Sequence, residues 1–147
     1  MQIQKDYIRE KILAAALDEF SSKGYRTATM SSIAECCGIS KSNLYRYFSS
    51  KDEICHELLI MPSMEIRKVL NVLTGTELLV YSNDEIAKRM TELLYPIISK
   101  YKKEIKIIMS PEAPQEGIAL KDLVEKKLLD NLIMQFQDLP PGRSFFL

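Results

Sequence analysis

The chain has 147 residues, of which 46% are hydrophobic and 27% charged, and this composition excludes a disordered protein. Its 20 basic and 20 acidic residues balance, so bulk charge does not indicate nucleic-acid binding. The three cysteines argue against a disulfide framework and predict a reducing, cytoplasmic location. No signal-peptide pattern is present, and no apolar run approaches the ~20 residues of a membrane span, so no membrane partner is expected.

Residues 4–23 are predicted to form a first helix, because their apolar side chains recur at spacings of three and four. These side chains are Ile8, Ile12, Leu13, Ala16, Leu17 and Phe20. Gly24 is suited to a left-handed cap at the helix end, and Tyr25 is expected to pack back on the helix. A second helix is predicted over residues 29–37, with Thr29 as its N-cap.

Residues 38–48, Gly-Ile-Ser-Lys-Ser-Asn-Leu-Tyr-Arg-Tyr-Phe, predict a tight turn followed by a short helix. Gly38 can adopt the positive φ of the turn, and Ser40 can cap the next helix. Leu44 and Phe48 are four residues apart, so both can bury on one side. The side chains left to face outward are Lys41, Ser42, Asn43, Arg46 and Tyr47. Their donors, acceptors and ring suit base edges and phosphates, as in a DNA-binding helix-turn-helix.

Local charge supports this interpretation. Between residues 23 and 51 the only acidic residue is Glu35. The five cations of the same stretch are Lys23, Arg26, Lys41, Arg46 and Lys51. Phosphates respond to such a local excess even in a neutral chain. The alternative is a solvated basic face on an ordinary helical bundle.

A fourth helix is predicted to begin at Ser50, because Ser50 and Glu53 have the spacing of a capping box. Its buried stripe is Ile54, Cys55, Leu58 and Leu59. Pro62 is expected to end or kink the helix, and apolar periodicity favours a kink with continuation to about Leu73.

Two further helices are predicted, over residues 84–109 and 119–137, and a kink or break is expected in the first of them at Pro96. Loops are predicted at residues 74–76, 82–84 and 111–117. No segment has the period of a strand. The fold class is therefore all-α.

A stripe of methionine, aromatic and isoleucine side chains in the later helices could line an apolar ligand pocket with a few polar tips. Its members are Met90, Tyr95, Ile98, Tyr101, Ile105 and Met109. The same spacing is typical of an ordinary core, and both interpretations stay open.

Catalytic and metal chemistry find little support. His56 is the only histidine, and the stretch from His56 to Ile60 begins like a zinc-protease helix but ends in isoleucine. The cysteines Cys36, Cys37 and Cys55 are predicted to be small buried hydrophobes. We therefore expect no enzymatic activity, no cofactor and no metal site.

Roughly the first sixty residues resemble the TetR family of transcriptional regulators. The resemblance is carried by residues 14–20, 23–25, 27–29, 33–34, 38–48 and 51–53, which agree in order and spacing. It implies a three-helix DNA-binding domain in residues 1–49 and a small helical ligand-binding and dimerisation domain in residues 50–147. It further implies a homodimer, a double-stranded operator and a small-molecule effector that releases the DNA.

The resemblance also implies roles for individual residues. Lys41, Ser42 and Asn43 stand where family members touch bases and phosphates, and Tyr45 matches a tyrosine whose hydroxyl contacts a phosphate. Whether Asn43 or Arg46 contacts a base or a phosphate stays open.

Other positions flank this recognition helix. Tyr47 stands where the family often has histidine, and could reach a base or a phosphate. Lys51 matches a lysine that pairs with the DNA backbone. Thr29 matches a phosphate-touching cap, with Ser31 and Ser32 as nearby candidates.

The chain is shorter than is usual for the family, whose members carry further long helices that build the dimer interface. Either this chain dimerises through residues 119–137 and their neighbours, or it is a truncated product. The hypothesis is a cytoplasmic, dimeric repressor with a near-palindromic operator and a small apolar effector. The alternative is a helical protein-interaction adaptor with a vestigial helix-turn-helix.

Overall fold

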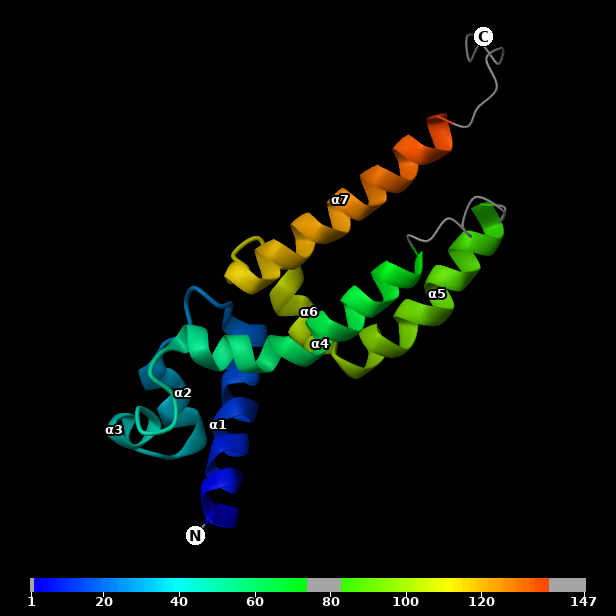
Figure 1. Cartoon of the computed structure of the whole chain (residues 1–147). Helices are drawn as coiled ribbons and strands as arrows, with labels where there is room; N and C mark the ends of the chain where they lie inside the picture. The colour runs from blue at the N-terminus through cyan, green and yellow to red at the C-terminus, as the bar shows by residue number, and fades with distance from the viewer. Residues whose placement is uncertain (1, 74–82, 138–147) are drawn as a thin grey trace.

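The computed structural model describes residues 2–73 and 83–137, and these form helices joined by short turns (Figure 1). The described part contains seven helices and no strand, which confirms the all-α prediction. The helices are α1 (Gln2–Lys23), α2 (Met30–Cys37), α3 (Lys41–Leu44), α4 (Lys51–Leu73), α5 (Asn83–Lys100), α6 (Lys102–Met109) and α7 (Gln115–Gln137).

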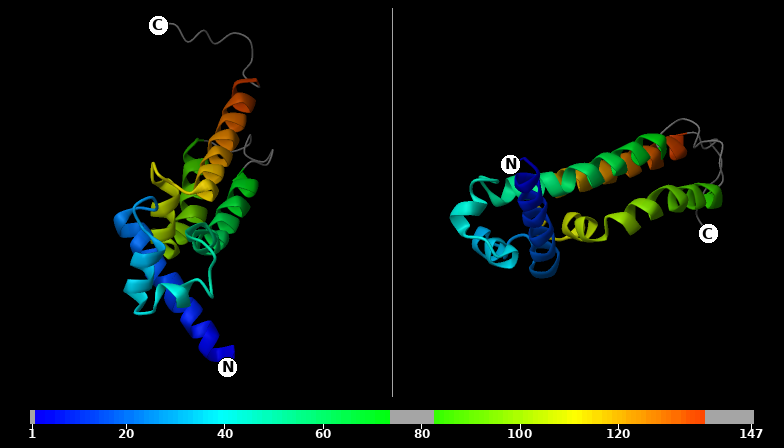
Figure 2. Two further views of the ribbon diagram at one scale, coloured as in Figure 1. Left: turned by 90° about the vertical axis from the view of Figure 1, so that its left-hand side faces the viewer. Right: turned by 90° about the horizontal axis from the view of Figure 1, so that it is seen from below.

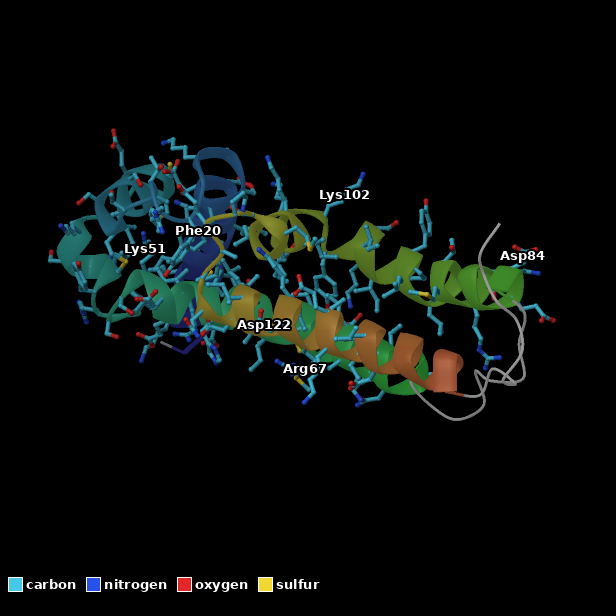
Figure 3. The ribbon with its side chains drawn as sticks, turned by 90° about the horizontal axis from the view of Figure 1, so that it is seen from above. Phe20, Lys51, Arg67, Asp84, Lys102 and Asp122 are labelled. Atoms are coloured by element: carbon cyan, nitrogen blue, oxygen red, sulfur yellow. The ribbon has the colours of Figure 1, made fainter. Side chains whose placement is uncertain are left out.

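The helices form an elongated molecule with α3 near one end (Figures 1 and 2). Helices α1 to α3 cluster there, while α4, α5 and α7 extend toward the other end. The short α6 packs against α1 and α7, so it joins the two groups. In Figure 3, Lys51 and Phe20 lie at the α3 end, whereas Asp84 marks the far end.

The main core lies where α1, α2, α3 and α4 meet. Each helix contributes side chains that are almost fully buried, and α6 and α7 close one side of the cluster. The largest of these side chains are Phe48, Ile12, Ile33, Leu44, Ile54, Leu59, Ile107 and Leu120. The predicted stripes of the first, second and fourth helices therefore face one another.

The end of α1 follows the prediction. Gly24 has φ 89°, and its N–H donates to the Phe20 carbonyl at 3.2 Å. The Tyr25 ring returns to the helix and meets the Phe20 ring edge-on at 5.4 Å. Glycine adopts this left-handed conformation without the steric cost that a Cβ would bring.

The start of α4 follows only half of the predicted capping box. The Glu53 N–H donates to Ser50 Oγ at 3.1 Å, as expected. The Glu53 carboxylate instead accepts from the N–H and the hydroxyl of Ser49, at 2.6 and 2.7 Å. These hydrogen bonds lower the pKa of Glu53. Beyond the cap, α4 runs through the buried Pro62 to Leu73, so the predicted continuation is confirmed.

The later helices differ from the prediction in two places. Pro96 lies inside α5, and the helical stretch is divided at Tyr101, which has φ −112° and ψ 40°. This division lets α5 pack on α4 while α6 packs on α1 and α7. Helix α7 starts at Gln115, so Gly117 is helical rather than part of a loop. A Cβ on Gly117 would lie 3.3 Å from the Ile108 Cα, so this glycine permits close packing of α7 on α6.

A smaller apolar cluster joins α4 to α5, with Val69 and Ile97 buried at its centre. None of the described helices has the length and hydropathy needed to cross a bilayer. The predicted loop at residues 74–76, and Ser82 of the one at 82–84, lie outside the described residues, whereas Asn83 and Asp84 form the start of α5 rather than a loop.

Candidate nucleic-acid interface

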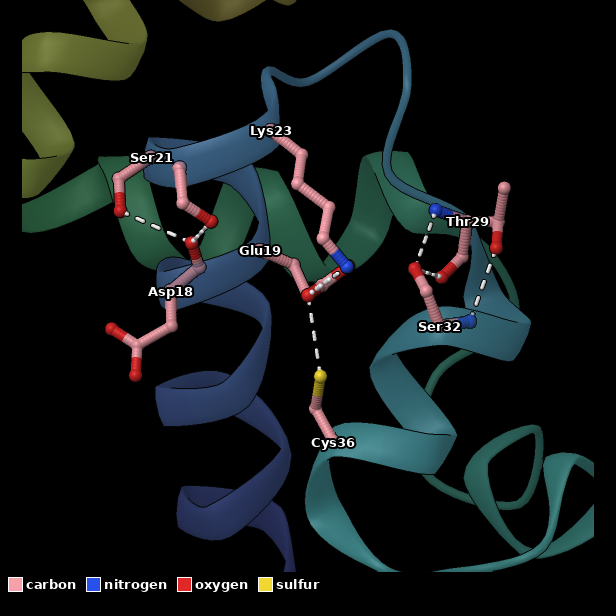
Figure 4. A network of polar contacts seen from close by, with 8 residues as sticks. Asp18, Glu19, Ser21, Lys23, Thr29, Ser32 and Cys36 are labelled. Carbon is pink, nitrogen blue, oxygen red and sulfur yellow. Dashed lines mark hydrogen bonds and ion pairs between the residues drawn. The ribbon is translucent and has the colours of Figure 1, made fainter.

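Helix α2 begins with a reciprocal cap. Thr29 Oγ1 accepts from the Ser32 N–H, and Ser32 Oγ accepts from the Thr29 N–H, both at 3.1 Å (Figure 4). At the other end Gly38 has φ 67°, and its N–H donates to the Glu35 carbonyl at 3.0 Å. These caps stop α2 at both ends, so the predicted boundaries of the second helix are confirmed.

Helix α3 starts after the turn, where Ser40 Oγ accepts from the Asn43 N–H at 3.2 Å. Its α-helical part ends at Leu44, but the Tyr47 and Phe48 N–H groups both donate to the Leu44 carbonyl, at 2.9 and 3.1 Å. Leu44 and Phe48 are buried, as predicted. The result is a tight helical end at which Tyr45 and Arg46 are exposed, whereas Tyr47, predicted to face outward, packs partly against the main core.

The polar side chains of this segment face solvent. Asn43 and Tyr47 are half-buried, and the Lys41 ammonium lies 6.0 Å from the Tyr45 ring centroid. The exposed residues of the predicted DNA-binding set, including two at the start of α2, are Thr29, Ser31, Lys41, Ser42, Tyr45 and Arg46. Figure 1 and the right-hand view of Figure 2 show α3 at one end of the molecule, away from α5 and α7. Within the described residues, no later helix covers this face, so a duplex can approach it.

Of the five cations between residues 23 and 51, two already have partners within the protein. The Lys23 ammonium is paired with Glu19 at 2.8 Å, and Lys51 donates to backbone carbonyls. Arg26, Lys41 and Arg46 have no carboxylate partner in the part of the chain that the structure describes. These three cations remain available to phosphates.

The helix-turn-helix coincides with a known family domain. The family model described as "Bacterial regulatory proteins, tetR family" matches residues 12–58, from the middle of α1 into α4. The uncharacterized HTH-type transcriptional regulator YdgC of Bacillus subtilis (strain 168) is 31% identical over 116 residues, which are 73% of this chain and 56% of YdgC. The chain belongs to the TetR family. It spans about half the length of YdgC.

Two further proteins show how far the similarity extends. The HTH-type transcriptional regulator RutR of Escherichia coli (strain K12) is 46% identical over 46 residues, which are 31% of this chain and 22% of RutR. The crystal structure of a TetR-family transcriptional regulator from Bordetella parapertussis 12822 matches with a TM-score of 0.64 and 22% identity. The match covers 92% of this chain and 72% of the Bordetella chain, so the TetR-like fold extends into the later helices.

Arg9 of α1, which is not part of the apolar stripe predicted for the first helix, supports the segment after α3. Its Nε donates to Glu57 Oε1 at 3.1 Å, and its terminal nitrogens contact the other Glu57 oxygen and the Tyr47 carbonyl. The Arg9 side chain of α1 thus contacts both α4 and the segment after α3, at Tyr47. Arg9 and Glu57 are 48 positions apart, so no local spacing signals the pair.

Glu19 is the centre of a second polar network (Figure 4). Only 5% of this residue is exposed, and it receives the Lys23 ammonium and the Cys36 thiol, the latter at 3.2 Å. The hydrogen bond from Lys23 lowers the pKa of Glu19. This network connects α1 to α2 and holds the two scaffold helices in register.

The cysteines differ in exposure. Cys36 is exposed, which corrects the prediction that it is buried, because its thiol reaches Glu19 from the edge of α2. The hydrogen bond to Glu19 raises the pKa of Cys36. Cys37 and Cys55 are buried as predicted, and burial raises the pKa of Cys55 to about 12. All three pKa shifts disfavour the reactive thiolate. The described residues contain no group of three or more potential metal ligands.

The predicted pocket residues do not share one environment. Tyr95 and Met109 are 68% and 65% exposed, and Ile98 is also exposed. Met90, Tyr101, and Ile105 pack instead against the small cluster between α4 and α5.

A half-open cavity of about 230 Å³ lies elsewhere, between α4 and α7. Its lining is His56, Leu59, Ile60, Ser63, Met64, Arg67, Glu116 and Ala119. His56 Nδ1 lies 3.1 Å from Glu116 Oε1 and links the two helices at this cavity.

Proposed function

We propose that the chain is a sequence-specific DNA-binding transcriptional regulator, with residues 1–49 as its DNA-binding domain and residues 50–147 as its ligand and dimer domain. The observation that carries the proposal is the exposed polar face of α3, presented by the buried Leu44 and Phe48. The names of YdgC and RutR, both HTH-type transcriptional regulators, support it. We propose a binding function without catalysis, exercised in the cytoplasm where DNA is available.

Roles within the interface follow from chemistry and position. Exposed hydroxyls at Thr29, Ser31 and Tyr45 suit phosphate oxygens, as does the Lys41 ammonium. Asn43 and Arg46 have the side chains that form bidentate contacts with adenine and guanine. Ser42 and Tyr47 flank them and complete the proposed contact set.

We further propose that the regulator acts as a homodimer on a near-palindromic operator, since two recognition helices about 34 Å apart enter successive major grooves. A small apolar effector would then release the DNA by preferring a state in which this spacing is wrong.

Selection of binding sites from a random duplex library tests the proposal. The full chain should enrich a near-palindromic site, and its affinity should fall steeply with added salt. Mass measurement in solution should give two chains on the selected duplex. Absence of DNA binding across the salt series would contradict the regulator function and favour a protein-interaction role.

A further inference from the structure

The Lys51 ammonium lies in a cradle of backbone carbonyls at the α1–α2 loop. Its Nζ is 2.8 Å from the Tyr25 carbonyl oxygen, 3.0 Å from that of Ala28 and 3.4 Å from that of Arg26. A lysine ammonium has three N–H donors, so these contacts can occupy all of them. Lys51 is the first residue of α4, and the loop that it contacts lies more than twenty positions earlier in the chain.

Tyr25 strengthens the same contact between the loop and α4. Its ring centroid lies 4.5 Å from the Lys51 ammonium, and its hydroxyl donates to Asp52 Oδ1. Burial, with the hydrogen bond to Asp52, raises the pKa of Tyr25, so the phenol stays a donor at neutral pH. Two consecutive residues of α4 therefore hold one loop residue, one through its backbone and ring and the other through its hydroxyl.

The position of the loop determines where α2 begins. The Ala28 carbonyl that receives Lys51 belongs to the residue directly before the N-cap Thr29. If Lys51 turned outward to a phosphate, three loop carbonyls would lose their charged donor. A contact between Lys51 and a DNA phosphate would therefore disturb the start of α2, the helix that precedes α3.

We propose that Lys51 is a positioning residue: it holds the α1–α2 loop and the start of α2 in the DNA-binding arrangement, and it does not neutralise a DNA phosphate. This inference rests on the proposed DNA-binding function. It assigns Lys51 a role different from the direct backbone contact that the family resemblance implies.

The salt dependence of DNA affinity separates the two roles. Each phosphate neutralised contributes a slope of about 0.9 in log affinity against log salt concentration. Lys51→Met should lower affinity about tenfold, because charge-assisted hydrogen bonds are lost, and leave the slope unchanged. Lys41→Met is the matched control: it removes an exposed ammonium on α3 and should lower the slope by about 0.9 for each protomer bound.

Limited trypsin digestion without DNA gives a second measurement. The peptide bond after Arg26 lies in the α1–α2 loop that Lys51 contacts, and Arg26 is exposed. In Lys51→Met the initial cleavage rate at this bond should rise about tenfold, since local opening becomes easier. Cleavage after Lys11, in the middle of α1, reports global unfolding and should not change. The Lys41→Met control should match the original protein at both bonds.

The outcomes decide between the roles. A slope lowered by about 0.9 for each protomer bound in Lys51→Met, or an unchanged cleavage rate after Arg26, overturns the proposal. If Lys51→Met unfolds, Lys51→Gln keeps an amide donor for the carbonyls, and it should show an intermediate cleavage rate with an unchanged slope. If the original protein binds no DNA, the proposed function fails. The cleavage measurement still tests whether Lys51 holds the α1–α2 loop.

Discussion

The Arg9 guanidinium carbon lies 4.4 Å from the centroid of the Phe48 ring. The same guanidinium is paired with Glu57 of α4 and contacts the Tyr47 carbonyl at 3.4 Å. Arg9 therefore joins α1, the segment after α3 that ends at Phe48, and α4. Because the Arg9 side chain contacts both Glu57 and Phe48, a movement of α4 would be transmitted to Phe48.

We expect Arg9→Met to lower the free energy of unfolding by about 1–2 kcal/mol, because a charged hydrogen-bonded pair and a cation–π contact are lost while the apolar stem remains. Urea unfolding measures this. Both side chains are about a third exposed, so solvent screening limits the pair itself. A double-mutant cycle with Glu57→Gln should give a coupling of about 0.5–1 kcal/mol, and a coupling of zero would show that the pair is not formed.

We expect substitutions at Gly38 to cost only backbone strain. Gly38 has φ 67°, and no atom lies within 4 Å of the place a Cβ would take. Gly38→Ala should therefore lower stability by about 1–2 kcal/mol, whereas Gly38→Asn should cost less, since asparagine tolerates the left-handed region better. Thermal or urea unfolding of the two variants checks this order. Equal losses in both would indicate a steric cause instead.

We expect Asn43→Ala to change sequence preference and Lys41→Met to weaken binding uniformly. An amide can pair with an adenine edge, which is worth about 1–3 kcal/mol of discrimination, whereas an exposed ammonium attracts any phosphate. Competition binding with the selected operator and single-base variants measures both effects. Equal loss on every duplex for both substitutions would place Asn43 at the backbone.

We expect the stabilisation from Glu19 to disappear at low pH. The hydrogen bond from Lys23 lowers the pKa of Glu19 from its usual 4.5 in the folded state. A carboxyl with a lowered folded-state pKa stabilises the protein above about 4.5 and loses this contribution as the pH falls through the folded value. The stability difference between the original protein and Glu19→Gln should therefore shrink between pH 7 and about pH 3. Urea unfolding across this range checks it, and a constant difference would contradict it.

Much of the helix-turn-helix is predictable from residues close together in the chain. Gly24 and Gly38 end helices because a left-handed residue is needed there, and Thr29 and Ser40 begin helices because their hydroxyls accept a nearby N–H. The 3.6-residue period of the apolar side chains identifies the buried faces. These signals act over four residues or fewer, so the sequence by itself determines them.

Contacts between residues far apart in the sequence could be identified only from the tertiary structure. The carbonyl cradle of Lys51, the pairing of Arg9 with Glu57 and the exposure of Cys36 depend on which helices become neighbours. The division of the later helices at Tyr101 has the same origin, because α5 packs mainly on α4, whereas α6 packs mainly on α1 and α7. Spacing along one helix identifies the face on which a side chain lies. Only packing decides whether a cation on that face meets water, a carboxylate or the carbonyls of another loop.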